Sequence, residues 1–581
     1  MNDRQSYNRA QSRNRMMIAS RWATAMCGAL LVATSAARAQ VPVTGDSYRS
    51  EIFVGSVPEN YLRYLQTVGL VPLYPWSSRS FSPREIDKLI PRDTAHPWHQ
   101  RFVSDEKTFY GIRYSIVRPS TSFRYNTGFA YGSNDGPIWA GRGLTSAIQA
   151  GFTARWGPAS LVLAPMAFWA ENRQFFIMPA VFNGIGPFAN ALHGGVDLPQ
   201  RFGDGAYSQI DPGQSTFRID VPFVAVGVST ANMGWGPATE YPLLLGNNAA
   251  GFPHVFAGTS SPLDIFIGKV QAKLFWGELF QSDYSNVSGP SYYVSKAEPG
   301  TKRFATGFVI VGQPRGIPGL EIGGARFFHS VWPKSGLPRS YFTKVFQAFL
   351  KTHLPPEIKV DDPRFPSTFG NGRGISDNQL AEVFARWVLP HSGFEISAEY
   401  GREDHNEDIR DLLQEPDHSR SYTLGARKVF AFNANSFTAV RFELINFQVP
   451  QLVRAPRGEG EVYLHGVIRQ GHTNRGQLLG ANVGVGAAAG STLAVEHYTP
   501  AGKWTLSWSR DLNQERGNFP LLGIREPFSM DVSHSIGLEN TRMIRDFDVT
   551  TGLTFVRDFN RDFSTDASNI NAIVAIRYNL R

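Results

Sequence analysis

The sequence lacks several features that mark common classes of protein. It has a single cysteine, Cys27, in 581 residues, which excludes disulfide-stapled folds and cysteine-ligated metal sites. Charged residues make up only 18% of the chain, against about 25% in ordinary soluble domains. Past the N-terminal region, no apolar run reaches the length of about 18 residues that a membrane-spanning helix needs. The absence of such runs excludes a helical membrane protein.

Catalytic motifs are missing as well. We find no G-x-S-x-G element and no H-E-x-x-H element, so neither a nucleophile nor a zinc site is predicted. Gly484-Val485-Gly486 and Gly370-Asn371-Gly372 lack the helix and acidic partner of a dinucleotide loop. The acidic run 403–408 lacks the glycine of an EF-hand. We therefore expect a protein that is not an enzyme and uses no cofactor and no metal; a secreted carbohydrate-active enzyme is disfavoured.

Residues 1–39 have the three-part pattern of a cleaved export signal. Arginines up to Arg21 precede the apolar stretch 23–33, and Ala37-Arg38-Ala39 is a small-residue cleavage site. The alternative is a cytosolic basic arm before a short helix. The segment holds six Arg and one Asp, so its removal lowers the formal charge from +8 to +3 and takes Cys27 with it. The basicity that would favour nucleic acid then disappears, and we expect no nucleic-acid partner.

Two short helices are predicted within residues 40–105, which we expect to form a periplasmic short-helix region. Residues 58–69 gather apolar side chains on one helical face and end at a glycine. A second helix begins at Ser82, with Pro83 in its first position and Glu85 completing a capping box. Helices of two or three turns are not stable alone, so both should pack on something larger.

From residue 106 onward the apolar pattern has a period of two. Residues 394–400, 503–509, 547–553 and 570–580 alternate apolar with polar side chains, which is typical of strands with one apolar and one polar face. A soluble sandwich would alternate in the same way. The export signal, the tryptophans near strand ends and the charges on the polar faces favour an outer-membrane β-barrel instead.

The length of this region sets the size of the barrel. About 475 residues, at roughly 26 per strand and connection, predict an all-β fold: a transmembrane antiparallel β-barrel of about 18 strands over residues 106–581. Residues 331–380 form a long loop with an amphipathic helix predicted over 340–353. This helix either packs within an extracellular loop or folds into the lumen as a plug or gate.

Several motifs share their order and spacing with one family of proteins. They are Tyr61-Leu62 through Gly69, Ser82-Pro83-Arg84-Glu85-Ile86, Gly141-Arg142-Gly143, 159–165 with Asn172, Trp235-Gly236-Pro237, 243–248, Asp377-Asn378-Gln379, Arg386-Trp387 and 399–404. In these motifs the chain resembles the Wzi family of capsule-assembly outer-membrane proteins. The sequence differs from the family in its non-aromatic final residues and in the 331–380 insertion.

The resemblance implies an 18-stranded barrel with a helical bundle at its periplasmic face, acting without catalysis as a lectin that organises capsular polysaccharide at the cell surface. The expected partners are capsular or extracellular polysaccharide, outer-membrane lipid and lipopolysaccharide, and the polysaccharide-export machinery. The alternative function is an outer-membrane porin or polysaccharide-export channel, with Lys269, Lys273 and Arg577 lining its path.

The surface polysaccharide that the resemblance implies needs aromatic faces for its sugar rings and polar groups for its hydroxyls. Asn247 and Asn248 follow a predicted apolar strand and would offer two amides at its mouth, or they form a turn. Trp235 is either a sugar platform or a packing aromatic. Glu395 and Glu399 share one strand face about 13 Å apart, which is too far for a glycosidase pair and favours lumen lining.

These considerations give two sets of candidate residues. The polysaccharide-binding candidates are Trp235, Asn247, Asn248, Glu399, Arg402, Glu403 and Asp404. The lumen-lining candidates are Lys269, Gln271, Lys273, Glu395 and Arg577.

Overall fold

The structure is a computed structural model that describes most of the chain from residue 48 to residue 579. The segments it leaves out are 1–47, 180–185, 194–195, 285–301, 333–335, 351–376, 404–405, 407, 418, 449–461, 466–467, 516–529 and 580–581. The expected export signal at 1–39 therefore lies outside the described residues. Of the helices in the described part of the chain, none combines the length and the apolarity that crossing a membrane requires.

Both predicted N-terminal helices are confirmed. Helix α2 (Val57–Thr67) has Ser56 as its N-cap, whose hydroxyl accepts a hydrogen bond from the backbone N–H of Glu59. Helix α3 (Pro83–Leu89) has the expected capping box between Ser82 and Glu85. The remaining helical segments are η1 (Arg49–Glu51), η2 (His99–Arg101), η3 (Arg339–Phe346), η6 (Pro390–Ser392) and α4 (Ile409–Gln414).

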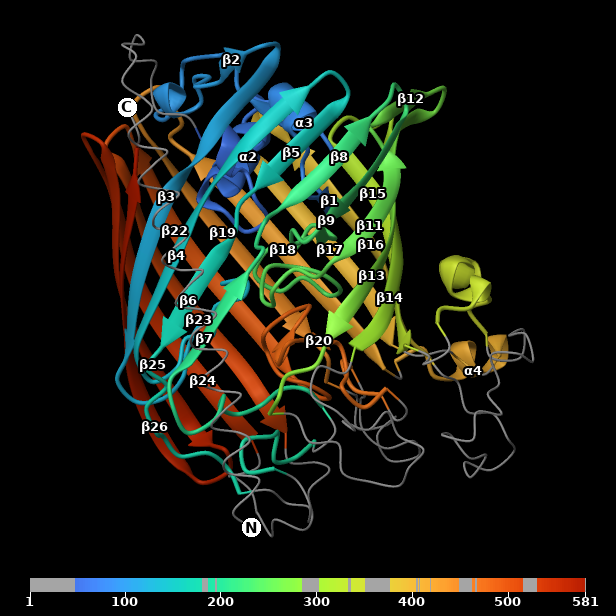
Figure 1. The fold of residues 1–581 in the computed structure, drawn as a ribbon, viewed down its shortest axis with the longest axis vertical. Coiled ribbons are helices and arrows are strands. Elements are labelled where there is room, and N and C mark those ends of the chain that lie inside the picture. Colours follow the sequence, from blue (N-terminus) through green and yellow to red (C-terminus); the bar gives the residue numbers. More distant parts are fainter. Residues whose placement is uncertain are drawn as a thin grey trace. The chain divides into compact units, whose positions relative to one another are not determined.

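The strands form a closed antiparallel barrel (Figure 1), which confirms the predicted fold class. The described strands occupy 18 positions around the barrel. Three positions are each filled by two short strands in succession: β5 with β6, β7 with β8, and β11 with β12. Strand β2 is not counted separately, because it only extends a hairpin beside β3. Pairing of β26 with β3 closes the ring.

The barrel strands differ greatly in length. They are β2 (Lys107–Phe109), β3 (Ile112–Asn126), β4 (Gly143–Trp156), β5 (Ala159–Leu163), β6 (Met166–Ala170), β7 (Tyr207–Asp211), β8 (Thr216–Asp220), β9 (Val224–Ser229), β11 (His254–Thr259), β12 (Leu263–Ile265), β13 (Gly268–Phe280), β14 (Lys302–Pro314), β15 (Leu320–Val331), β16 (Asp377–Leu389), β17 (Phe394–Glu403), β18 (Arg420–Phe430), β19 (Phe437–Asn446), β22 (Ala489–Thr499), β23 (Gly502–Glu515), β24 (Met530–Ile544), β25 (Phe547–Arg561) and β26 (Thr565–Tyr578). Two small sheets lie apart from the barrel, β1 (Ser78–Arg79) with β10 (Gly234–Trp235) and β20 (Thr473–Asn474) with β21 (Gln477–Leu478).

The two ends of the barrel have different connections. At one end, which is uppermost in Figure 1 and is called the short-turn end here, two-residue turns such as Gly157-Pro158 and Arg545-Asp546 join the strands. At the other, the long-loop end, connections such as 127–142, 171–206 and 447–488 carry most of the irregular chain. The turn after β25 is the one short connection of this end among those described in full.

The outer face of the barrel is apolar. On β24, β25 and β26 the outward side chains include Ile536, Leu538, Leu553, Phe555 and Ile570, each 44–58% exposed. Leaving such side chains exposed costs free energy in water, at about 25 cal/mol per Å² of apolar surface, and costs nothing against lipid. The alternation seen in the sequence therefore separates a lipid-facing wall from a polar lumen.

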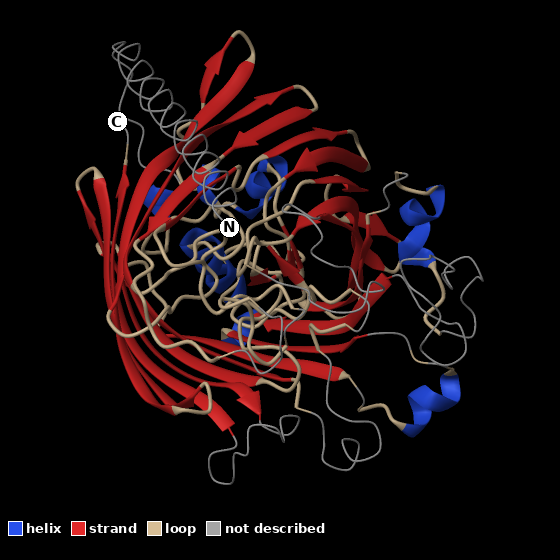
Figure 2. Cartoon of the chain, turned by 60° about the horizontal axis from the view of Figure 1, so that its bottom comes forward, coloured by secondary structure: helices blue, strands red, loops and turns tan. Residues whose placement is uncertain are grey.

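Irregular chain fills much of the lumen (Figure 2). The N-terminal segment packs against the inner wall through an aromatic cluster in which Tyr61 stacks on Trp98 at 4.5 Å and Phe437 stacks on Tyr498 at 4.6 Å. A second cluster joins the connection 230–253 to the wall and includes Trp235, which has no exposed surface.

In this region one sequence prediction is wrong, and one of two alternatives is excluded. Residues 243–245 do not form a strand; they are buried in irregular chain inside the lumen, where their apolar side chains serve the second cluster. Segment η3 is not a luminal plug. Its Phe342 carbonyl accepts a hydrogen bond from Trp276 on β13, and its Tyr341 ring packs on Phe304 of β14, on the outer side of the wall. The end of the predicted helix, 351–353, lies outside the described residues.

Candidate functional site

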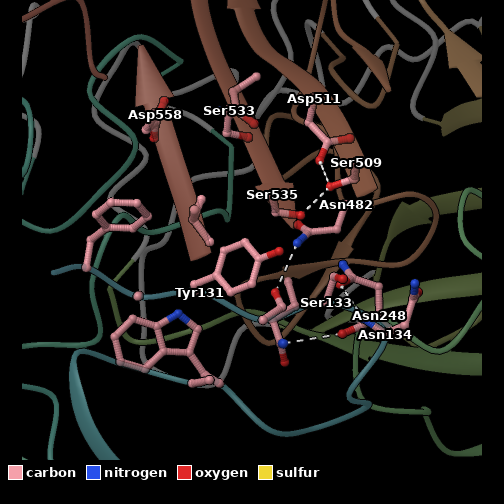
Figure 3. Close-up of a pocket in the computed structure, with 18 of the residues that line it drawn as sticks. Tyr131, Ser133, Asn134, Asn248, Asn482, Ser509, Asp511, Ser533, Ser535 and Asp558 are labelled. Atoms are coloured by element: carbon pink, nitrogen blue, oxygen red, sulfur yellow. Dashed lines mark hydrogen bonds between the residues drawn. The ribbon is translucent and has the colours of Figure 1, made fainter. Parts of the chain in front are cut away.

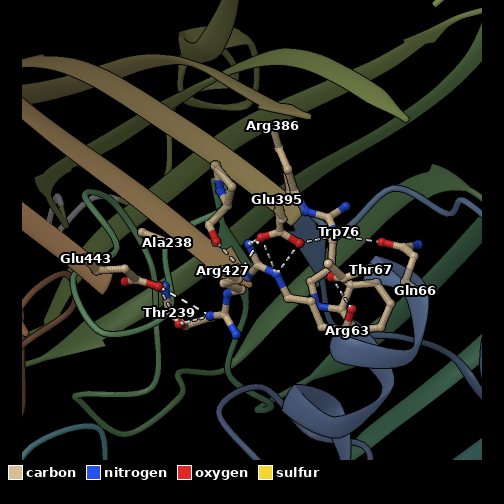
Figure 4. Close-up of polar contacts among 12 residues, drawn as sticks. Arg63, Gln66, Thr67, Trp76, Ala238, Thr239, Arg386, Glu395, Arg427 and Glu443 are labelled. Atoms are coloured by element: carbon tan, nitrogen blue, oxygen red, sulfur yellow. Dashed lines mark hydrogen bonds and ion pairs between the residues drawn. The ribbon is translucent and has the colours of Figure 1, made fainter. Parts of the chain in front are cut away.

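Buried wall carboxylates hold the N-terminal segment in the lumen (Figure 4). Glu321 on β15 accepts a hydrogen bond from the backbone N–H of Trp76 at 2.9 Å. Glu395 on β17 pairs with Arg63 of α2 at 2.5 Å. Arg386 on β16 lies between the two carboxylates and contacts both, at 2.7 Å from Glu395. This charge network ties α2 to three neighbouring strands.

Two further wall glutamates hold the connection 230–253. Glu399 on β17 accepts the backbone N–H groups of Ala238 at 2.7 Å and Leu243 at 3.3 Å. Glu443 on β19 accepts the backbone N–H of Thr239 at 2.9 Å. Each carboxylate satisfies backbone donors that would otherwise be buried without partners. These glutamates fix part of the connection 230–253 to β17 and β19.

A polar cavity of about 470 Å³ remains on the other side, between the luminal loops and the inner faces of β22–β25 (Figure 3). The wall contributes small hydroxyl side chains at successive inward positions, Ser507 and Ser509 on β23 and Ser533 and Ser535 on β24. The hydroxyls of Ser509 and Ser535 are 2.7 Å apart. Small polar side chains leave room beside the wall and offer both donors and acceptors.

The loops contribute larger groups to the opposite side of the cavity. Tyr131, Asn134 and Trp139 come from the connection 127–142, and Asn482 comes from the connection 447–488. Burial raises the pKa of Tyr131 above its ordinary value, so its hydroxyl stays protonated at neutral pH. The side-chain oxygen of Asn134 accepts no hydrogen bond from the described residues. Aromatic rings from the loops thus face the serine-lined wall.

Acceptors outnumber cations in this cavity. Its lining includes five carboxylates and two guanidinium groups, contributed by Glu240, Asp511, Asp531, Asp558, Asp562, Arg441 and Arg561. Both arginines are already paired, Arg441 with Glu240 and Arg561 with Asp558 at 2.9 Å. Asp511 accepts a hydrogen bond from the Tyr241 hydroxyl at 2.8 Å. The cavity therefore suits a ligand rich in hydrogen-bond donors and low in negative charge.

A second cavity of about 170 Å³ lies toward the short-turn end, between the N-terminal segment and β3, β4, β25 and β26. Tyr48 and Trp98 line it on one side, and Ser122 and Arg577 line it on the other. Ile138, from the connection 127–142, lines both cavities. The connection 127–142 therefore lies between the two cavities. Arg124 on β3 holds this connection through an ion pair with Asp135.

The structure does not gather the polysaccharide-binding candidates in one cavity. Trp235 is buried against Phe275, at 5.6 Å between ring centroids. The Asn247 side chain donates to the carbonyl of Asn134 at 2.8 Å, and only Asn248 of this set lines the larger cavity.

The other four candidates lie on or after β17. Glu399 holds backbone donors as described above, and Glu403 is buried and accepts a hydrogen bond from Asn378 at 2.7 Å. Arg402 donates to Asn406 at 2.8 Å and to the carbonyl of Pro416 at 3.0 Å. Asp404 lies outside the described residues.

The lumen-lining candidates lie on inward strand positions but serve different contacts. Gln271 donates to Glu85 at 2.9 Å, and the Lys273 ammonium lies over the Phe256 ring at 4.5 Å. Lys269 is exposed near the β12–β13 turn. Glu395 belongs to the charge network, and Arg577 pairs with Glu51 at 3.3 Å.

Sequence reasoning missed the residues that face the larger cavity. Ser507, Ser509 and Asp511 alternate with the apolar positions of β23, so the pattern could have marked them as lumen-facing. It could not show that the luminal chain leaves a cavity beside this part of the wall. Among the described residues, no cluster of three or more His, Asp or Glu side chains is placed to hold a metal ion.

Comparisons with known proteins find no similar sequence but do find a similar fold. No family profile matches this sequence, and no curated protein sequence matches it. Among solved structures, the Escherichia coli outer-membrane protein Wzi, described as a carbohydrate-binding β-barrel involved in group 1 capsule assembly, superposes with a TM-score of 0.55 at 14% identity, over 91% of this chain and 99% of that one.

Two further solved structures match less well. Acinetobacter baumannii OccAB2 gives a TM-score of 0.37 at 10% identity over 81% of this chain and 98% of its own. Pseudomonas aeruginosa OccK5 (OpdH) gives 0.38 at 9% identity over the same shares. The likeness to Wzi confirms, at the level of the fold, the resemblance found in the sequence: this chain has the fold of an 18-stranded outer-membrane β-barrel.

Proposed function

We propose that this protein resides in the outer membrane and binds capsular or other extracellular polysaccharide at the cell surface, without catalysing a reaction on it. The observation that carries the proposal is the 470 Å³ cavity, in which serine hydroxyls, amides and carboxylates face Tyr131 and Trp139. Aromatic faces and polar groups of this kind are what sugar rings and hydroxyls require. The fold of a carbohydrate-binding barrel supports it.

The proposed orientation puts the long-loop end outside the cell. Bacterial barrels have short periplasmic turns and longer extracellular loops, so residues 48–105, packed inside the barrel, would be reached from the periplasm. We also propose that residues 1–39 are removed on export. The larger cavity, built largely by loops of the long-loop end, would then take a surface glycan.

The lining also suggests a class of glycan. Five carboxylates and two paired arginines oppose the entry of uronic acids through like-charge repulsion. Neutral sugars and amino sugars bring donors to the exposed acceptors. We therefore expect oligomers of these sugars to bind more tightly than oligouronates of the same length.

Retention of polysaccharide on cells tests the proposal. A deletion strain should release surface polysaccharide into the medium, and the intact gene should restore attachment. A gene carrying Ser509→Ala with Asp511→Asn should restore the folded barrel in the membrane but not the attachment of polysaccharide. The control variant Asp264→Asn, at the opposite end of the barrel on β12, should restore both the folded barrel and the attachment. Unchanged attachment in the deletion strain would exclude the proposed function.

A second function, a channel, is favoured by one observation. Ile138 lines both luminal cavities, so the connection 127–142 is the element that would separate or join the two ends of a path. Conductance across planar bilayers distinguishes the functions. A polysaccharide anchor should give small steps or none, whereas a channel should give regular steps of one size.

A further inference from the structure

The cavity of about 470 Å³ has three carboxylates at one end. Asp531 on β24 and Asp558 on β25 line it from the wall, and Asp562 lines it from the turn that follows β25. Asp558 lies opposite Ser533 in the pairing of the two strands (Figure 3), so Asp558 and Asp531 are diagonal neighbours on the inner face. All three belong to the long-loop end of these strands. We call this group the acidic end.

The acidic end carries more negative charge than its cation balances. Within the described part of the chain, Arg561 is the cation that pairs with it, at 2.9 Å from Asp558 and 3.5 Å from Asp562. Asp531 is held by neutral donors instead, the Asn513 amide at 3.0 Å and the backbone N–H of Asp562 at 2.8 Å. Three ionised carboxylates therefore face one guanidinium. Because like charges in one place repel, a further cation would stabilise this end of the cavity.

Two carboxylate oxygens of the acidic end lack hydrogen-bond donors. Asp558 is 1% exposed, and its Oδ1 accepts no hydrogen bond from the described residues. Oδ2 of Asp562 accepts none from them either. A buried carboxylate oxygen without a donor is costly, because it has lost its water and gained no partner. Both residues line the cavity, so a ligand in the cavity would supply the missing donors.

A protonated amine meets both requirements at once. An ammonium group is a compact positive charge with three N–H donors and no acceptor. A sugar hydroxyl brings one donor and no charge. A metal ion brings charge, but the described residues include no cluster of three or more His, Asp or Glu side chains placed to hold one. The charge and the missing donors together favour an ammonium group.

The lining beside the acidic end indicates what carries the amine. Ser533 and Ser535 continue the inner face of β24 from Asp531, and Tyr131 lies on the loop side of the same cavity (Figure 3). Hydroxyl groups and an aromatic ring suit the hydroxyls and the faces of a sugar. An amino group on a sugar ring places the cation and the ring within one residue of a glycan.

We propose that the acidic end binds the protonated amino group of an amino sugar that is not N-acetylated, with Asp558 and Asp562 accepting its N–H groups. This inference rests on the proposed function and narrows it, from sugars that bring donors in general to glycans that carry free amines. An N-acetyl group has one N–H and no charge, so it leaves the excess negative charge of the acidic end in place.

Titration calorimetry of the folded barrel with two matched probes, the chitin tetramer and its fully deacetylated form, tests this proposal. Wild type should bind the deacetylated tetramer at least about tenfold more tightly, the effect of one hydrogen bond to a charged group. Asp558→Asn and Asp562→Asn should each remove most of this preference. Asp566→Asn, which removes one exposed negative charge at the same end of the barrel but outside the cavity lining, should keep it. Heat-modifiable gel mobility checks that all three variants are folded.

Asp562→Asn covers the case in which Asp558→Asn does not fold. Asp562 lies in a turn at a φ of 52°, a left-handed conformation that Asn adopts readily. Equal affinity of wild type for the two tetramers, no binding of the deacetylated tetramer, or an unchanged preference in the folded variants of Asp558 and Asp562 would each overturn the proposal. Equal affinity would leave the proposed function standing, and retention of polysaccharide on cells tests that function separately.

Discussion

The charge network around Glu395 offers a sharp test of how the luminal segment is held. Replacing Glu395 with Gln keeps the size of the side chain but removes the negative charge. Arg63, Arg386 and Arg427, each at most 2% exposed, would then share fewer carboxylates. Buried guanidinium groups left without their carboxylate cannot be solvated by water, so the substitution destabilises the folded state.

The expected size follows from the burial of both partners. Breaking a buried ion pair by changing one partner costs about 3–5 kcal/mol. Two direct contacts, to Arg63 at 2.5 Å and Arg386 at 2.7 Å, are lost together, so Glu395→Gln should fall within that range. The exposed pair of Asp264 with Arg315, with side chains 64% and 60% exposed, is the matched control, and Asp264→Asn should cost about 0–1 kcal/mol.

Urea unfolding in lipid vesicles, followed by tryptophan fluorescence and by heat-modifiable gel mobility, measures both variants. Glu395→Gln should also expose residues 48–105 to protease, because α2 loses its main attachment to the wall. If Glu395→Gln and Asp264→Asn differ by less than about 1 kcal/mol, the network does not hold the segment and the reasoning fails.

Three further predictions concern other parts of the lumen. Arg124→Ala frees the connection 127–142 from its ion pair with Asp135 and should raise single-channel conductance in planar bilayers; unchanged conductance would show that this connection does not control the path. Burial lowers the pKa of His96 to about 4, so the unfolded chain binds more protons than the folded chain between pH 4 and 6.5. The free energy of unfolding should therefore decrease as the pH is lowered through this window. Urea unfolding at pH 7 and pH 5 should show a smaller acid loss in His96→Gln, and an equal loss in both proteins would refute the assignment. Trp235→Ala leaves a cavity beside Phe275 and should cost about 3–5 kcal/mol in urea unfolding, whereas a cost below about 1 kcal/mol would contradict its packing role.

The sequence predicted the elements whose signals are local. Ser82, Pro83 and Glu85 lie within one helical turn, so the capping box of α3 could be recognised without knowing the fold. The alternation in 570–578 likewise depends on one strand, and Ile570 and Val574 do face outward. Strand number followed from chain length, because each barrel strand and connection uses a similar number of residues.

The contents of the lumen could not be predicted in this way. Residues 243–245 are apolar because they pack against distant strands, and a short apolar run looks the same in a strand and in buried irregular chain. The position of η3 depends on Trp276 and Phe304, which are far away in the sequence. The cavity lies between luminal loops and strands that are distant in the sequence, which no single segment reveals.

Binding of oligosaccharides to the purified, folded barrel tests the central proposal most directly. Titration calorimetry with neutral, amino-sugar and uronic-acid fragments should give saturable binding of the first two classes and weaker binding of the third. Ser509→Ala with Asp511→Asn should weaken this binding about tenfold or more, since each lost hydrogen bond to a charged group is worth about 1.5–3 kcal/mol. Absence of binding for every class, or affinity unchanged by the double substitution, would contradict the assignment of the cavity as a saccharide site.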